Sequence, residues 1–259
     1  METPLYEGSH RKLFEAFLRL ADDYEAQTAA LLDLTSWSEA RSLLSVGGGE
    51  GIVEAALLRN APLAEVWYLD PSPEQVDAFR AYMQREHLLD RVKGVAESTF
   101  QDYTTSQKFD RIVSMFSWFF IGTAQRELEK LIDLLAPDGV ACLVLPNTDS
   151  IGADFNRSLS PDKRMTLVGD EVVQALDDLG YGSTRHAFTK WLPGDEMFEG
   201  EAASKASLAF AAFVAMRPID AFTASERGHI ADLLQARRGA NGVPLIWDVI
   251  VVKSGLSDD

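Results

Sequence analysis

The chain has 259 residues, of which 46% are hydrophobic and 25% charged, and its formal net charge is −16. A chain of this length and ordinary composition is expected to fold as a single globular domain, residues 1–259, with a sizeable core. The acidic balance argues against nucleic acids and membranes as partners, because neutralising their phosphates needs clustered Lys and Arg. It is compatible with a small-molecule substrate, including a cationic one.

Cysteine and histidine, which form crosslinks or bind transition metals, are scarce. The single cysteine, Cys142, excludes an internal disulfide and a thiolate metal cluster, and it lies in an apolar run that predicts burial. The histidines are scattered, so we expect no protein-held metal. The start of the chain lacks a charged-then-apolar signal layout, and the longest apolar stretch, Leu208–Met216, is too short to span a bilayer. We therefore expect a cytoplasmic protein.

The first part of the chain alternates between helical and strand patterns. An apolar face at helical spacing predicts a first helix over residues 9–34. The alternation that follows predicts an α/β fold, a mostly parallel sheet with helices on both faces. Strands are predicted at 41–46, 65–70, 92–95, 110–115 and 140–145, helices at 50–59, 73–87 and 125–135, and a turn at 137–139.

The second part of the chain breaks this alternation. A helix at 169–180 and a strand at 183–189 are followed by two helices, 203–216 and 225–238, before a last strand at 245–252. The second of these helices opens with a capping box of Thr223 and Glu226. An insert at this point is expected over the carboxyl edge of the sheet, where ligands bind. We divide the domain into an N-terminal helical lid (1–38), a core (39–192), a helical insert (193–242) and a last strand with tail (243–259).

A glycine-rich turn follows the first predicted strand. Gly47, Gly49 and Gly51 form a G-x-G-x-G pattern, and Asp70 ends the next strand. In a Rossmann-like sheet the turn lets the backbone approach a nucleoside, and an acid about twenty residues on takes the ribose hydroxyls. A dinucleotide loop needs a glycine where Ile52 stands, and no basic P-loop ending follows. The pattern favours S-adenosylmethionine (SAM), which has a ribose but no phosphate; a tight turn without a ligand is the alternative.

Three segments carry a closer resemblance. They are residues 44–51 (LSVGGGEG), 70–75 (DPSPEQ) and 114–116 (SMF). Together they resemble the histamine N-methyltransferase family, within the class I SAM-dependent methyltransferases. The resemblance implies a seven-stranded Rossmann-like fold whose last strand is antiparallel, with an N-terminal helix and a helical insert before that strand. Where the family has a pair of tyrosines, this chain reads Ser-Trp-Phe-Phe at 117–120, so histamine itself is not inferred.

The same resemblance assigns cofactor contacts. It places Gly47 beside the methionine part of SAM, Asp70 on the ribose hydroxyls and Gln75 near the adenosine. It also places Ser98 beside the adenine. An acid after the third strand, such as Glu97, often borders the adenine amine, but it also suits the cap of the next helix. The full predicted cofactor-binding set is Gly47, Gly48, Gly49, Gly51, Asp70, Pro71, Gln75, Glu97, Ser98, Val113 and Ser114.

Methyl transfer from a sulfonium is a direct displacement, for which positioning and exclusion of water matter most. Aromatic walls suit a cationic methyl group and a cationic amine. An aromatic run, residues 116–120, directly follows the fourth predicted strand, and Trp118 within it is predicted to contact the substrate. His10 and Asp23 in the first helix are candidates to accept or steer the substrate's proton. The other predicted substrate contacts are Tyr6, Phe14, Phe17, Phe155, Phe213 and Trp247.

These patterns together predict a SAM-dependent methyltransferase that methylates a nitrogen of a small amine- or imidazole-bearing molecule. O-methylation of a small phenol or acid is one alternative, although it would favour a base or metal near the fourth strand. A SAM-binding protein without turnover is another, because intact cofactor residues do not themselves prove catalysis.

Overall fold

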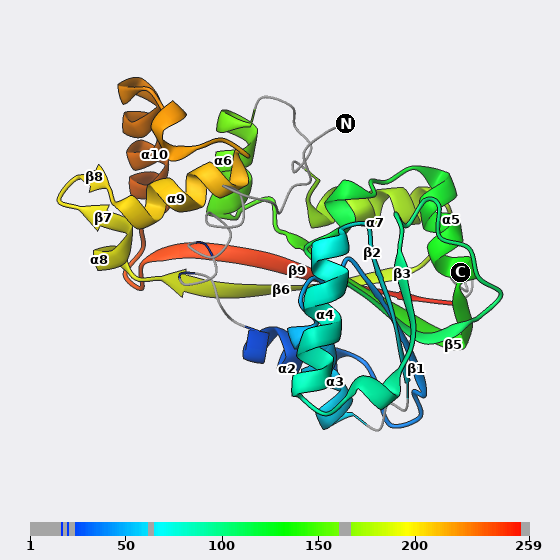
Figure 1. Ribbon diagram of the computed structural model, residues 1–259. Coiled ribbons are helices and arrows are strands. Elements are labelled where there is room, and N and C mark those ends of the chain that lie inside the picture. The colour runs from blue at the N-terminus through cyan, green and yellow to red at the C-terminus, as the bar shows by residue number, and fades with distance from the viewer. Residues whose placement is uncertain (1–16, 18–19, 21–23, 62–64, 161–166, 255–259) are drawn as a thin grey trace. The chain divides into compact units, whose positions relative to one another are not determined.

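The computed structural model describes residues 17, 20, 24–61, 65–160 and 167–254 (Figure 1). The chain divides into two compact units. The sheet unit comprises residues 24–145, 169–186 and 248–259, and the helical unit comprises residues 1–23, 146–168 and 187–247. No helix in the described part of the chain is long and apolar enough to span a membrane.

A seven-stranded sheet has the strand order β3-β2-β1-β4-β5-β9-β6. Strands β1 to β5 pair in parallel, which requires the crossover helices between them. All five residues of β1 are buried, as expected for a strand covered on both faces. The predicted α/β fold is therefore confirmed. The strands are β1 (Ser42–Val46), β2 (Glu65–Asp70), β3 (Val92–Glu97), β4 (Phe109–Met115), β5 (Leu135–Pro146), β6 (Ser183–Leu192) and β9 (Val243–Lys253).

The last strand, β9, runs antiparallel to β5. Near the end of β5, the amide of Asn147 donates to the carbonyl of Ile246 over 3.1 Å. Near its start, the amide of Ser254 donates to the carbonyl of Gly139 over 3.0 Å. Residue numbers along β9 therefore decrease where those of their partners along β5 increase. This agrees with the antiparallel last strand that the family resemblance implies.

The helices of the sheet unit follow the predicted order. Helix α4 begins as its sequence suggests, because Ser72 caps it through the amide of Gln75 and Pro73 occupies its first turn. It packs against β2 and β3 (Figure 1). The helices are α2 (Tyr24–Leu34), α3 (Ile52–Asn60), α4 (Pro73–Arg85), α5 (Gln125–Asp133) and α7 (Gly169–Asp178), with short 3₁₀ segments η1 (Leu89–Arg91) and η2 (Trp118–Phe120).

The predicted turn at 137–139 was wrong, because these residues lie inside β5. Phe109 of β4 pairs with Leu135, but Arg111 pairs with Val140, so β5 carries extra residues opposite β4. Asp138 takes a left-handed conformation (φ 61°) within this irregularity. Pro-Asp-Gly is a turn signal. Because β5 pairs with β4 both before and after these residues, they form a bulge rather than a chain reversal.

The helical unit contains more structure than the sequence suggested. Helix α6 (Ile151–Leu159) was not predicted, and neither was the antiparallel hairpin of β7 (Phe198–Glu199) and β8 (Ala202–Ala203). The capping box of Thr223 and Glu226 at the start of the last helix is confirmed. The remaining elements are α8 (Gly194–Met197), α9 (Lys205–Val214), η3 (Ile219–Ala221) and α10 (Ala224–Arg237).

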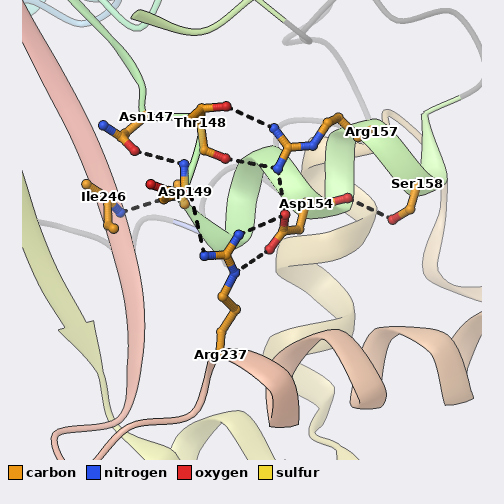
Figure 2. Close-up of polar contacts among 9 residues, drawn as sticks. Asn147, Thr148, Asp149, Asp154, Arg157, Ser158, Arg237 and Ile246 are labelled. Carbon is orange, nitrogen blue, oxygen red and sulfur yellow. Dashed lines mark hydrogen bonds and ion pairs between the residues drawn. The ribbon is translucent and has the colours of Figure 1, made fainter. Parts of the chain in front are cut away.

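Aromatic packing and polar contacts between its helices stabilise the helical unit. Phe17 stacks on Phe213 with ring centroids 4.9 Å apart, and Phe210 lies 5.1 Å from Phe17. At the end of α10, Arg237 donates to Asp154 of α6 over 2.7 Å (Figure 2). Arg157 donates to the same carboxylate over 2.6 Å. The shared carboxylate thus ties α6 to α10 beside an apolar core.

Candidate functional site

The loop between β1 and α3 depends on glycine. Gly47, Gly49 and Gly51 all have positive φ angles, 65°, 56° and 84°. Residues with a side chain rarely adopt positive φ angles, so glycine at these three positions allows the tight turn that the sequence predicts. A Cβ atom on Gly47 would lie 2.5 Å from Cβ of Ser117, and one on Gly51 would lie 2.5 Å from the ring of Phe79. The loop therefore packs directly against neighbouring elements on both sides.

Ser117 joins the loop to the end of β4. Its hydroxyl lies 2.6 Å from the carbonyl oxygen of Val46, to which it donates, and 2.7 Å from Oγ of Ser114. Ser114 is fully buried and Val113 nearly so. The first residues after β4 are consequently fixed against the glycine loop.

A buried carboxyl group lies on the other side of the loop. Ser45 Oγ donates to Oε1 of Glu54 over 2.6 Å, and Glu54 is 1% exposed. A Cβ atom on Gly48 would lie 2.2 Å from Ser45 Oγ and 2.8 Å from that Oε1, so both groups contact the loop backbone. Burial raises the pKa of Glu54 to about 7, against the opposing effect of the Ser45 hydrogen bond.

Asp70 lies at the carboxyl end of β2, as predicted. Its side chain is largely buried, and Oδ1 accepts the amide of Ser72 over 2.9 Å. Burial raises its pKa, and hydrogen bonds from the amides of Ser72 and Gly49 oppose that shift. Two residues earlier on the strand, the hydroxyl of Tyr68 donates to the carbonyl of Gly49 over 2.7 Å. The acid and the glycine loop are therefore directly connected.

Gln75 faces the same loop from α4. Its Oε1 is buried without a hydrogen-bond partner and would lie 3.7 Å from a Cβ atom on Gly49. A buried carbonyl oxygen of this kind normally accepts a hydrogen bond, so its lack of a partner suits a donor group on a bound molecule. Pro71, between Asp70 and the start of α4, is exposed.

The end of β3 adjoins Asp70. Glu97 pairs with Asp70 in the sheet register and is exposed. The amide of the next residue, Ser98, donates to the carbonyl of Asp70 over 3.2 Å, while its side chain is half-buried. Both predicted adenine-side residues therefore lie at the strand edge that carries the acid; their contact with adenine stays a prediction.

The aromatic run after β4 is anchored and strained. Phe116 has a positive φ of 50°, which is rare for a bulky residue and often accompanies a functional constraint. Trp118 is fully buried against Phe100, 5.2 Å away between ring centroids, and its indole N–H has no hydrogen-bond partner. Phe119 and Phe120 pack edge to face. The predicted contact of Trp118 with substrate is not tested by this placement.

The remaining predicted substrate residues belong to the helical unit or lie outside the described residues. Phe155 is fully buried and Phe213 nearly so, and both pack in the aromatic cluster with Phe17. Trp247 is 4% exposed and stacks on Phe188 at 4.6 Å. His10, Asp23, Tyr6 and Phe14 lie outside the described residues.

SAM fits the chemistry of the residues that this edge gathers. The glycine loop offers backbone groups, Asp70 offers a buried carboxylate for hydroxyl donors, and Gln75 offers an acceptor without a partner. These groups match a ribose and an adenosine, and none of them is a cation that would favour a phosphate. Within the described ranges, no cluster of three or more His, Cys, Asp or Glu side chains could hold a metal ion.

Comparison with known proteins decides the family. A family model described as a methyltransferase domain matches residues 8–197. The chain belongs to this family. It is a class I SAM-dependent methyltransferase, and SAM is its cofactor. The methyltransferase is also 24% identical, over 160 residues, to a tRNA1(Val) (adenine(37)-N6)-methyltransferase from Flavobacteriaceae bacterium (strain 3519-10), covering 54% of this chain and 68% of that protein.

Solved structures share the fold of the methyltransferase. Coclaurine N-methyltransferase bound to N-methylheliamine and SAH has a TM-score of 0.60 at 14% identity, covering 89% of this chain and 72% of that one. A methyltransferase candidate from Bacillus halodurans C-125 has a TM-score of 0.64 at 12% identity, covering 88% and 99%. At these identities the likeness shows the fold alone.

From the sequence, we did not predict that Ser45, Glu54 and Ser117 contact the glycine loop. Ser45 lies between Leu44 and Val46 in β1, and Glu54 is an acid between apolar residues of α3. A polar residue flanked by apolar ones on each of two successive buried elements is the signal that could have paired them. Ser117 was considered only as a departure from the family pattern, since nothing in the sequence places it against Gly47.

Proposed function

We propose that this methyltransferase transfers the methyl group of SAM to a nitrogen atom of a small amine- or imidazole-bearing molecule. The observation that carries the proposal is the contact of Ser117 with Gly47. It fixes the start of the aromatic run 116–120 against the loop that we propose holds SAM. Aromatic side chains beside a sulfonium favour its cationic methyl group and exclude water.

The proposed cofactor site consists of the glycine loop and the ends of β2, β3 and β4. Asp70 would accept the ribose hydroxyls, and Gln75 and Ser98 would lie on the adenosine side. Val113 and Ser114 would line the site from β4. When bound, SAM supplies a methyl group on a sulfonium, and the protein's main task is to align an acceptor with it.

Two features favour a small nitrogen acceptor. The net charge of −16 disfavours a polyanion such as tRNA, despite the limited likeness to a tRNA methyltransferase, and suits a cationic amine. The segments 44–51 and 70–75 also resemble the histamine N-methyltransferase family. A neutral amine attacks through its own lone pair, so a strong base is not required; His10 and Asp23 stay candidates to steer its proton.

The test is a methyl-transfer screen with isotopically labelled SAM. The panel contains small amines and imidazoles, small phenols, and bulk tRNA, and mass spectrometry locates the label. We expect label on a nitrogen of a small molecule. Asp70→Asn should lose most of this activity, while Asp77→Asn, a change at an exposed acid of α4, should keep it.

Label that enters only tRNA, or only a phenol oxygen, would overturn the proposed acceptor while leaving the cofactor site intact. Equal activity of the Asp70→Asn and Asp77→Asn proteins would instead contradict the proposed cofactor site.

A further inference from the structure

Glu54 is a buried acid that the proposed reaction does not yet use. It lies in the first turn of α3 and is 1% exposed. One carboxyl oxygen accepts the hydroxyl of Ser45 over 2.6 Å, and the other, Oε2, is buried without a hydrogen-bond partner. A carboxylate buried without an opposite charge is costly, and a structural role alone would be served equally well by a neutral side chain.

The carboxyl group touches the glycine loop. Its Oε1 would lie only 2.8 Å from a Cβ atom on Gly48, so no atom separates the carboxyl group from the loop backbone at this point. Interactions between charges at short range are strong where water is excluded. A charged molecule bound at the loop would therefore interact electrostatically with the Glu54 carboxylate.

The charged groups around Glu54 do not neutralise it. From β2, Asp70 adds a like charge, and the pKa of the Tyr68 phenol is raised by burial and then by Asp70 and Glu54. From α2, which packs on α3, the acids Glu25 and Asp33 are exposed. The electrostatic potential in this part of the site is therefore negative.

Two cations on and beside α3 have partners near its C-terminal end. Arg59 pairs with Glu86, and Arg91 donates to the carbonyl of Leu58 over 2.5 Å. Among the described residues, no cation forms an ion pair with Glu54.

We propose that Glu54 is a specificity residue whose carboxylate makes the glycine loop prefer the cationic donor SAM over its neutral product, S-adenosylhomocysteine. SAM carries a sulfonium charge that the product lacks, so methyl transfer removes a positive charge that would stabilise the buried carboxylate. The product is then held less tightly than the donor. The inference rests on the proposed placement of the cofactor at the glycine loop.

The raised pKa gives this preference a pH signature. Because burial raises the pKa of Glu54 to about 7, a cation in the loop should favour its ionised form and release a proton. The affinity for SAM should therefore rise with pH through 7. The affinity for S-adenosylhomocysteine should change much less.

The experiment compares calorimetric titrations of the two ligands at pH 6 and pH 8.5. In the wild-type protein the preference for SAM should grow about tenfold over this range. Glu54→Gln should weaken SAM binding five- to tenfold at pH 8.5, leave the product's affinity within about twofold, and abolish the pH dependence. Glu127→Gln is the matched control, since Glu127 is another buried helical acid with an unpartnered oxygen, on α5. It should behave like the wild type.

The possible results distinguish a specificity role of Glu54 from a purely structural one. Equal weakening of both ligands by Glu54→Gln, or an unchanged preference, would overturn the proposal and leave Glu54 a structural support. If Glu54→Gln does not fold, the wild type still tests it: titrations in buffers of different ionisation enthalpy should show proton release with SAM and none with the product. Failure of the folded wild type to bind either ligand would overturn the cofactor placement itself.

Discussion

The two units of this methyltransferase use buried side chains differently. Around the glycine loop of the sheet unit, polar side chains are hydrogen-bonded: Ser117 and Tyr68 donate to backbone carbonyls, and Glu54 accepts from the side chain of Ser45. The core of the helical unit is mostly aromatic and aliphatic, and Asp154 forms its polar tie between α6 and α10. The first arrangement fixes the path of the loop backbone, whereas the second fills the space between helices.

This difference predicts that residues in the core of the helical unit affect stability without affecting cofactor affinity, whereas residues around the glycine loop affect the binding of SAM. The following changes test that separation, from the largest expected effect to the smallest.

Phe210→Ala should destabilise the protein by about 3–5 kcal/mol, because it removes a ring that is 1% exposed from the centre of the aromatic cluster. Affinity for SAM should stay within about twofold at a temperature where the variant is folded. Urea unfolding and calorimetry measure the two quantities. Trp191→Ala, at an aromatic residue that is 43% exposed, is the control and should cost far less stability. Cofactor affinity that falls in parallel with stability would break the separation.

Glu54→Gln should change how stability depends on pH. The folded protein holds the Glu54 proton more tightly than the unfolded chain, since burial raises its pKa from 4.5 to about 7. This contribution, roughly 3 kcal/mol, is fully present below the unfolded pKa and is lost as pH rises through 7. The variant's stability relative to the wild type should therefore improve from pH 5 to pH 8 in urea unfolding. Parallel pH curves for wild type and Glu54→Gln would contradict the assignment.

Gly47→Ala should weaken SAM binding about a hundredfold, which is about 2.7 kcal/mol. The added Cβ would collide with Ser117 at 2.5 Å and would force a side chain to accept a φ of 65°. Gly200→Ala is a matched control, because Gly200 has a similar φ of 68° but open space around it. Its effect should be confined to stability. Equal loss of SAM affinity in both variants would mean that the contact with Ser117 is irrelevant to the site.

The sheet unit was predictable where local sequence decides structure. Strand β2 has the predicted bounds, because an apolar run ends at Asp70 and a Pro-containing helix start follows. The bulge in β5 was not predictable, since it depends on pairing with β4 rather than on Pro-Asp-Gly itself. Helix α6 was missed because the segment before it, Asn147–Ser150, has the composition of a loop.

The candidate site divides in the same way. Gly47, Gly51 and Asp70 could be predicted as cofactor residues because their spacing along the chain follows a known pattern. Glu54 and Ser117 could not, because each acts through a contact with a residue on another element. Contacts between the aromatic residues and a methyl acceptor depend on tertiary packing, which local sequence patterns do not encode.

The most direct test of the central claim, that the glycine loop and Asp70 hold SAM, is a calorimetric titration of SAM into wild type, Asp70→Asn and Asp77→Asn. We predict micromolar-range binding by the wild type and by Asp77→Asn, and an affinity about ten- to a hundredfold lower in Asp70→Asn, which corresponds to the 1–3 kcal/mol of a lost buried hydrogen-bond partner. Unchanged SAM affinity in a folded Asp70→Asn protein would contradict the claim.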